Sequence, residues 1–235
     1  MNVQSILDEL QPLGLESYKK VMLNHGVGEP IYGVKIEELQ KIRKRIKKDH
    51  QLALGLYDTG VYDAMYLAGM IADDEKMTRE DLCHWAELAT RGGLAGTTVP
   101  GVAAGNAQGY ALALEWIDSE KQHVVEAGWA TLATIMSVSK DEDLDLKELG
   151  RLLDRVRREI HDAPNHVRYQ MNGFVIAAGC FVRPLTEAAM RTAEAIGKVT
   201  VDMGNTACKV PFAPDYIRKV EQRGTLGKKR KSAKC

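Results

Sequence analysis

The stretch Tyr32–His50, YGVKIEELQKIRKRIKKDH, places an apolar stripe and a basic face on one predicted helix. Apolar side chains recur at the spacing of one helical face, at Ile36, Leu39, Ile42 and Ile46. The other directions carry the cations Lys35, Lys41, Arg43, Lys44, Arg45, Lys47 and Lys48. The apolar face predicts packing against a core. The basic face predicts either a solvated surface or a contact with anions.

The charge of the whole chain is balanced but unevenly placed. Among 235 residues, 32 Lys and Arg offset 32 Asp and Glu, so the formal net charge is zero. Basic residues are dense at 35–48 and 218–234, and acidic residues at 73–87 and 141–148. Because 45% of the residues are hydrophobic, the composition is that of an ordinary globular protein of one or two domains. The neutral total therefore hides a bipolar surface.

The chain carries no signal for a membrane, a secretion path or a metal. No apolar run approaches the roughly 18 to 20 residues of a membrane-spanning helix, and the N-terminus lacks the pattern of a secretion signal. The four cysteines are far apart and the six histidines are scattered, without metal-ligand spacing. We therefore expect a cytoplasmic protein with reduced thiols and with neither metal nor cofactor.

Helical periodicity dominates the chain, and strand signals are almost absent. Apolar spacings of three and four predict helices near 3–10, 15–23, 36–46, 51–57, 61–71, 79–89, 110–117, 121–137, 144–160, 165–179, 186–199 and 213–222. Short connections such as Asp58-Thr59-Gly60 predict antiparallel neighbours. The sequence therefore predicts an all-α fold.

The predicted helices come in pairs with a rough period of 35 to 45 residues. This spacing favours a curved superhelical stack of antiparallel helix pairs, a HEAT-like or ARM-type solenoid, over the alternative of a closed bundle. We expect one such domain over residues 1–224. The basic segment 225–235 is expected to be a mobile tail.

A glycine-rich segment lies in the middle of the chain, from Arg91 to Gly109. Gly101, Gly105 and Gly109 are four residues apart, which on a helix would make a groove for the close approach of a neighbouring helix or of a ligand. The phosphate-loop pattern GxxxxGK[ST] is absent, so nucleotide hydrolysis has no support.

A second constellation is Asn165–Gly179, NHVRYQMNGFVIAAG. Arg168 and Asn172 lie one helical turn apart, and Tyr169 and Phe174 add aromatic surface nearby. Such side chains can bind phosphates and stack on bases. A core aromatic residue beside an exposed arginine explains the same pattern, so both interpretations stay open.

Four segments together resemble the DNA alkylation repair family of AlkD-like proteins, over nearly the whole chain. They are the segment at 32–50, LALGLYDTGVYDAMYLAGMI at 52–71, VRYQMNGFVIAAG at 167–179 and TACKVPFAPDYIRKVEQRGTLGKKRK at 206–231. The resemblance implies a C-shaped stack of HEAT-like helix pairs that holds duplex DNA on a basic concave surface. It also implies removal of N3- or N7-alkylated purines.

The residues that the resemblance implies for that chemistry are not matched. Active relatives use a Trp with an Asp four residues later, and an Arg on a following helix. In this chain Leu94 and Thr98 take the first two places, and the Arg position falls near Gly128 or Trp129. Losing one electrostatic stabiliser typically costs about 10²- to 10³-fold in rate. Glu126 and Trp129 are weak substitute candidates, so the catalytic residues stay unknown.

The favoured hypothesis is a protein that binds duplex or damaged DNA on a basic concave face, with doubtful base excision. The alternatives are an active N-alkylpurine glycosylase with a rearranged site, and a non-catalytic helical scaffold that binds RNA or an acidic protein. The predicted DNA contacts are Tyr32, Lys35, Arg43, Arg91, Arg168, Asn172 and Lys209.

Overall fold

The computed structural model describes residues 1–90 and 92–234, which form helices, turns and loops with no strand. The α-helices are α1 (Val3–Leu10), α2 (Glu16–Asn24), α3 (Ile36–Ile46), α4 (His50–Asp58), α5 (Tyr62–Ile71), α6 (Arg79–Leu88), α7 (Thr98–Ala103), α8 (Gly109–Trp116), α9 (Gln122–Val138), α10 (Leu146–Glu159), α11 (Asn165–Phe181), α12 (Thr186–Ile196) and α13 (Ala213–Gln222). Short 3-10 turns are η1 (Gln11–Leu13), η2 (Asp74–Lys76), η3 (Gly92–Leu94), η4 (Asp141–Asp143) and η5 (Arg183–Leu185). The all-α prediction is confirmed.

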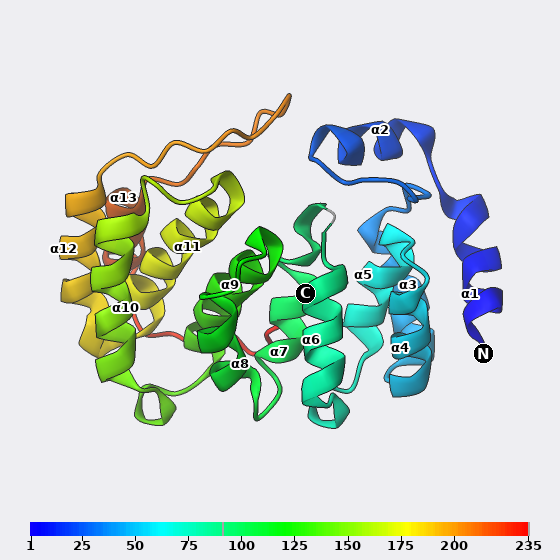
Figure 1. Ribbon diagram of the computed structural model, residues 1–235, viewed down its shortest axis with the longest axis horizontal. Coiled ribbons are helices and arrows are strands. Elements are labelled where there is room, and N and C mark those ends of the chain that lie inside the picture. Colours follow the sequence, from blue (N-terminus) through cyan, green and yellow to red (C-terminus); the bar gives the residue numbers. More distant parts are fainter. Residues whose placement is uncertain (91, 235) are drawn as a thin grey trace.

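The helices form a curved two-layer array (Figure 1). One row runs α5, α7, α9, α11 and α13, with each helix packed on the next. The other layer pairs with this row, as α4 does with α5, α8 with α9 and α12 with α11. The stack of helix pairs predicted from the sequence is therefore the observed architecture, and the closed bundle is not.

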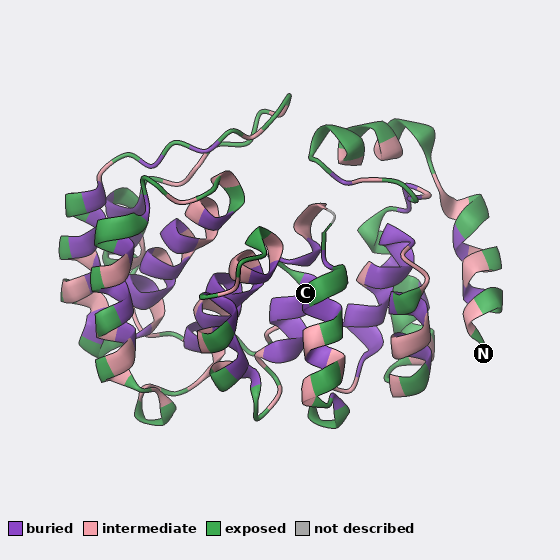
Figure 2. Ribbon diagram, in the orientation of Figure 1, coloured by how far each residue is buried: buried purple, intermediate pink, exposed green. Residues whose placement is uncertain are grey.

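The hydrophobic core consists of two clusters that meet at α8 and α9. Val124 and Ala127 of α9 belong to the N-terminal cluster, whereas Leu132 and Met136 of the same helix belong to the C-terminal cluster. Figure 2 shows the buried residues concentrated in α5, α7, α9 and α11. Among the described residues, no single helix has the length and apolarity to cross a membrane. Only α11 and the segment 183–196, taken together, have that length and composition, and the chain bends by 115° between them.

The ends of the predicted helices follow local chemistry. Thr78 and Asp81 form a reciprocal capping box at the start of α6, and Asp49 accepts a hydrogen bond from the backbone N–H of Leu52 at the start of α4. The glycine-rich segment is the exception. Only Gly101 lies within α7, whereas Gly105 lies in a turn and Gly109 begins α8. The expected glycine groove along one helix is therefore wrong.

The C-terminal segment 225–234 packs against the helices, which differs from the mobile tail expected from its composition. The backbone N–H of Gly227 donates to Cys180 O and that of Arg230 to Ser137 O, each at 2.8 Å. Lys229 Nζ donates to Met136 O at 2.9 Å and pairs with Asp141 at 2.8 Å. Lys234 bonds Ala72 O and pairs with Asp74. The tail thus supplies donors to carbonyls at the C-terminal ends of α11, α9 and α5, where cations suit the helix dipole.

Replacing Lys229 by alanine should destabilise the fold, whereas replacing the adjacent Lys228 should not. Lys229 makes a partly buried, charge-assisted contact, but the Lys228 side chain is exposed. We expect Lys229→Ala to lower the free energy of unfolding by about 1–2 kcal/mol, and Lys228→Ala to change it by less than about 0.5 kcal/mol, in urea denaturation. Equal effects of the two variants would contradict a docked tail.

Candidate nucleic-acid interface

A cleft of about 860 Å³ opens at the N-terminal ends of α9 and α11. Its walls come from segments that are distant in sequence. They are the end of α2 at residues 23–26, the connection from α6 to α7, the first turns of α9 and α11, and residues 201–205. The cleft is therefore built by both halves of the array.

One wall belongs to an extended segment, residues 197–212, which we call the arm (Figure 1). Three polar side chains of α11 hold its base. Asn165 exchanges two hydrogen bonds with the backbone of Asp202, and Arg168 donates to Thr200 O at 2.9 Å. Asn172 donates to Pro211 O at 3.0 Å. These contacts fix the two sides of the arm to one helix face.

The prediction that Asn172 is a surface contact for DNA is therefore wrong. Asn172 is only 1% exposed, and its amide is used to hold the arm. Arg168 is half-buried, and its guanidinium donates hydrogen bonds to Thr200 O and Ala163 O. Helical periodicity identified the face on which both residues lie, but it could not reveal that the partner of that face is another part of the chain.

The tip of the arm lies against the end of α2. Gly204 adopts a left-handed backbone conformation, with φ of 63°, and a β-carbon there would lie 3.2 Å from Asn24 O. Residues 205–208 share a smaller hollow with Val21, Asn24 and His25. Figure 1 shows the arm and α2 projecting toward each other from the two ends of the array. Together they close the cleft on one side.

The lining of the cleft mixes polar and apolar residues and contains no Lys or Arg among the described residues. The three histidines of the lining are His25, His123 and His166, and its two acidic residues are Glu126 and Asp202. The first turns of α9 and α11 both face the cleft, so their free backbone N–H groups and partial positive charge favour anions there. The described part of the lining therefore offers amides, imidazoles and helix ends to a ligand.

Glu126 and Gln170 form a carboxyl–amide pair in the cleft. Gln170 Nε2 donates to Glu126 Oε1 at 3.3 Å, and Tyr169 lies next to Gln170 in the lining. Burial raises the pKa of Glu126, and the charge of nearby His166 and the bond from Gln170 oppose that shift. Gly96 makes room for the pair, because a β-carbon there would lie 2.5 Å from Gln170 Nε2.

The remaining predicted contacts do not line the cleft. Lys35 and Arg43 are exposed on α3, and Lys35 pairs with Glu37 at 3.8 Å. Tyr32 is half-buried against the N-terminal cluster. Lys209 is exposed on the arm. Arg91 lies outside the described residues.

Trp129, one of the two catalytic candidates, is a core residue. It is 1% exposed and packs edge to face on Phe174, with ring centroids 5.1 Å apart. The guanidinium of Arg155 lies 5.8 Å from its ring centroid. Leu94, at the family's Trp position, is fully buried. Of the two candidates, only Glu126 lines the cleft.

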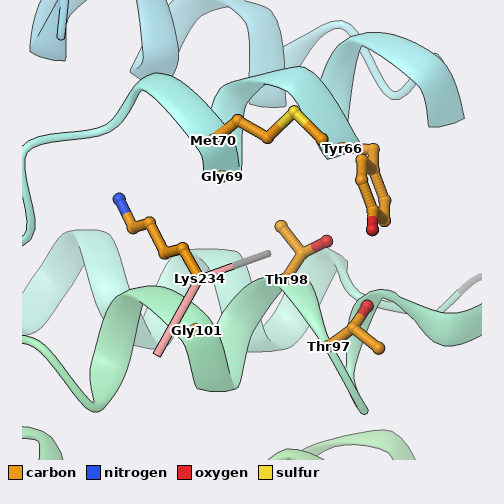
Figure 3. A pocket seen from close by; sticks show the side chains of 7 residues that line it. All are labelled: Tyr66, Gly69, Met70, Thr97, Thr98, Gly101 and Lys234. Carbon is orange, nitrogen blue, oxygen red and sulfur yellow. The ribbon is translucent and has the colours of Figure 1, made fainter. Parts of the chain in front are cut away.

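A second cavity, between α5 and α7, is too small to hold a nucleotide. Figure 3 shows its lining, with Tyr66, Gly69 and Met70 on one side, Thr97, Thr98 and Gly101 on the other, and the Lys234 side chain extending away from Thr98. The cavity measures about 30 Å³, which is the room of about one water molecule. It is a packing gap under the end of the tail.

The curved array of helix pairs defines a HEAT-like helical-repeat protein. Comparison with known proteins agrees with this class. A solved structure with TM-score 0.91 and 32% sequence identity covers 100% of both chains. That structure is described as a new family of proteins related to the HEAT-like repeat DNA glycosylases, with affinity for branched DNA structures.

The chain belongs to the DNA alkylation repair enzyme family, whose sequence model matches residues 6–198. Two uncharacterized proteins are also similar. One from Listeria monocytogenes is 33% identical and one from Listeria innocua is 32% identical, each over 221 residues that span 92% of this chain and 95% of the relative. The resemblance inferred from the four sequence segments is confirmed.

Replacing Glu126 by glutamine should stabilise the fold at neutral pH but not at acid pH. Because the folded-state pKa of Glu126 is raised, ionisation of this group costs stability as the pH rises above the ordinary Glu pKa of 4.5. Glutamine removes that cost and can still accept the bond from Gln170. Thermal melts at pH 4 and pH 8 should therefore show a gain for Glu126→Gln that appears only at pH 8.

The matched control is Glu120→Gln, which removes the same charge from an exposed residue just before α9. It should leave the melting temperature unchanged at both pH values. A gain for Glu126→Gln that is the same at pH 4 and pH 8 would contradict the burial of an ionisable group.

Proposed function

We propose that this protein binds branched DNA in the cleft between the arm and α2, and that it does so without excising a base. The observation that carries the proposal is the cleft itself, whose walls come from both ends of the array. The fold is similar over its full length to that of a protein with affinity for branched DNA structures, which supports the same substrate class.

Phosphate groups would contact the rim of the cleft. The N-termini of α9 and α11 offer backbone N–H groups, and Lys209 is an exposed cation on the arm. Arg43 and Lys44 of α3, and Lys47 directly after it, are exposed and make no ion pair within the described residues. They form a second cationic surface that another duplex of the branched DNA could contact. Contacts at separate places suit a branched molecule better than a single straight duplex.

The lining of the cleft opposes base excision by the family's chemistry. Excision needs an ionised carboxylate to stabilise an oxocarbenium-like transition state. Two acidic residues line the cleft, Glu126 and Asp202, and one oxygen of Glu126 accepts a hydrogen bond from Gln170. No described tryptophan lines the cleft. Because Leu94 and Thr98 take the family's Trp and Asp positions, the described site does not repeat the arrangement of an active relative.

The protein should bind a four-way junction more tightly than a duplex of equal length. The reason is that the protein would neutralise phosphates on more than one duplex of the junction at the same time. In fluorescence anisotropy at several salt concentrations, we expect a log–log salt slope that is steeper for the junction by about 0.9 per additional phosphate contacted. Equal affinity and equal slope for junction and duplex would refute the proposal. Stronger competition by RNA or an acidic peptide would favour the scaffold alternative.

Incubation with methylated DNA should release no N3- or N7-methylpurine above the uncatalysed rate, because Leu94 and Thr98 take the places of the Trp and Asp that active relatives use. Chromatography of the released bases measures this directly. Release that disappears in Glu126→Gln would instead identify an active glycosylase with a rearranged site.

A further inference from the structure

We infer that Glu126 and Gln170 form a pocket for a single unpaired nucleobase at the branch point, and that it selects a base with an exocyclic amino group. The inference rests on the proposed function, since it names the part of the branched DNA that enters the cleft.

The composition of the cleft lining points to a base rather than a phosphate. A phosphate at the floor would meet the carboxyl group of Glu126 without a lysine or arginine among the described lining residues. An uncharged base avoids that repulsion and carries donors and acceptors on its edge. Tyr169, next to Gln170 in the sequence, also lines the cleft and offers an aromatic face on which a base can stack.

The geometry of the pair leaves hydrogen-bonding groups free for a ligand. The one bond between the two side chains, at 3.3 Å, uses one oxygen of Glu126 and one amide hydrogen of Gln170. The second carboxyl oxygen and the amide oxygen remain as acceptors. Acceptors recognise the exocyclic amino groups of cytosine and adenine, and thymine has no such group.

Glycines in the connection between α6 and α7 form the wall of the cleft that leaves room for the Glu126–Gln170 pair. Gly96 lies so close to the pair that an added β-carbon would meet Gln170 Nε2 at 2.5 Å and Glu126 Oε1 at 3.2 Å. Both atoms are at the ends of flexible side chains, so an alanine there would move the pair rather than break the fold. Gly93 lines the same wall, but a β-carbon there would have only ordinary contacts with Thr97, the nearest at 3.7 Å.

The test uses the full-length protein and three-way DNA junctions that carry one unpaired nucleotide at the branch point, either cytosine or thymine. We expect the wild-type protein to bind the cytosine junction roughly 5- to 100-fold more tightly, the range of one specific base contact. Gly96→Ala and Gln170→Ala should abolish this preference, and Gly93→Ala should keep it. Circular dichroism melts check that each variant folds.

The outcomes separate the two proposals. If the wild-type protein binds both junctions equally, the base pocket is overturned but branched-DNA binding is not. The same holds if Gly96→Ala and Gln170→Ala both keep the preference for the cytosine junction. A wild-type protein that binds no junction overturns the proposed function, and the pocket with it.

Discussion

The packing of α9 against both halves of the molecule is the constraint on which the rest of the structure depends. Its Val124 and Ala127 lie in the N-terminal core, and its Leu132 and Met136 lie in the C-terminal core. Trp129 locks this helix to α11 through its edge-to-face contact with Phe174. The two ends of α9 therefore make different contacts. Its first turn lines the cleft, and its last carbonyls accept hydrogen bonds from the docked tail.

The fold was largely predictable from the sequence because apolar residues recur at helical spacing and several helices, such as α4, α6 and α10, begin at side-chain caps. The exception is α7, which lies in a segment rich in glycine with Pro100 inside it, so intrinsic propensity opposes a helix there. All six residues of α7 are buried. Tertiary burial therefore stabilises a helix that local patterns do not predict.

The site was less predictable, because a pattern on one helix does not reveal which partner it meets. The sequence predicts that Arg168 and Asn172 share a helix face, and they do, but that face holds the arm. The charge of the C-terminal segment predicts a mobile tail, whereas its lysines bond carbonyl oxygens at the ends of α5 and α9. Glu126 is a candidate from the sequence alone. Its pairing with Gln170, 44 residues away, required the fold.

The basic face of α3 shows why local charge density overestimates a binding surface. Lys41 pairs with Glu38, Arg45 with Glu9 and Lys48 with Asp73, so part of the predicted cationic face is neutralised by the protein itself. Such exposed pairs contribute little to stability, but they reduce the charge available to DNA. The cations left over on α3 do not line the cleft. The remaining cations of α3 and the described lining of the cleft are therefore separate surfaces of this molecule.

Glu126 is the group that stability alone does not explain. A buried carboxyl group whose pKa is raised costs free energy at neutral pH, and glutamine at this position would keep the bond from Gln170 without that cost. Folds tolerate such costs mainly at functional sites, where a group must be free for a ligand instead of satisfied by the protein. Gly96 allows the pair to pack closely against the backbone, because an added β-carbon would meet both side chains. Both residues line the large cleft between the two halves of the chain. Their positions are explained if part of a bound DNA occupies that cleft.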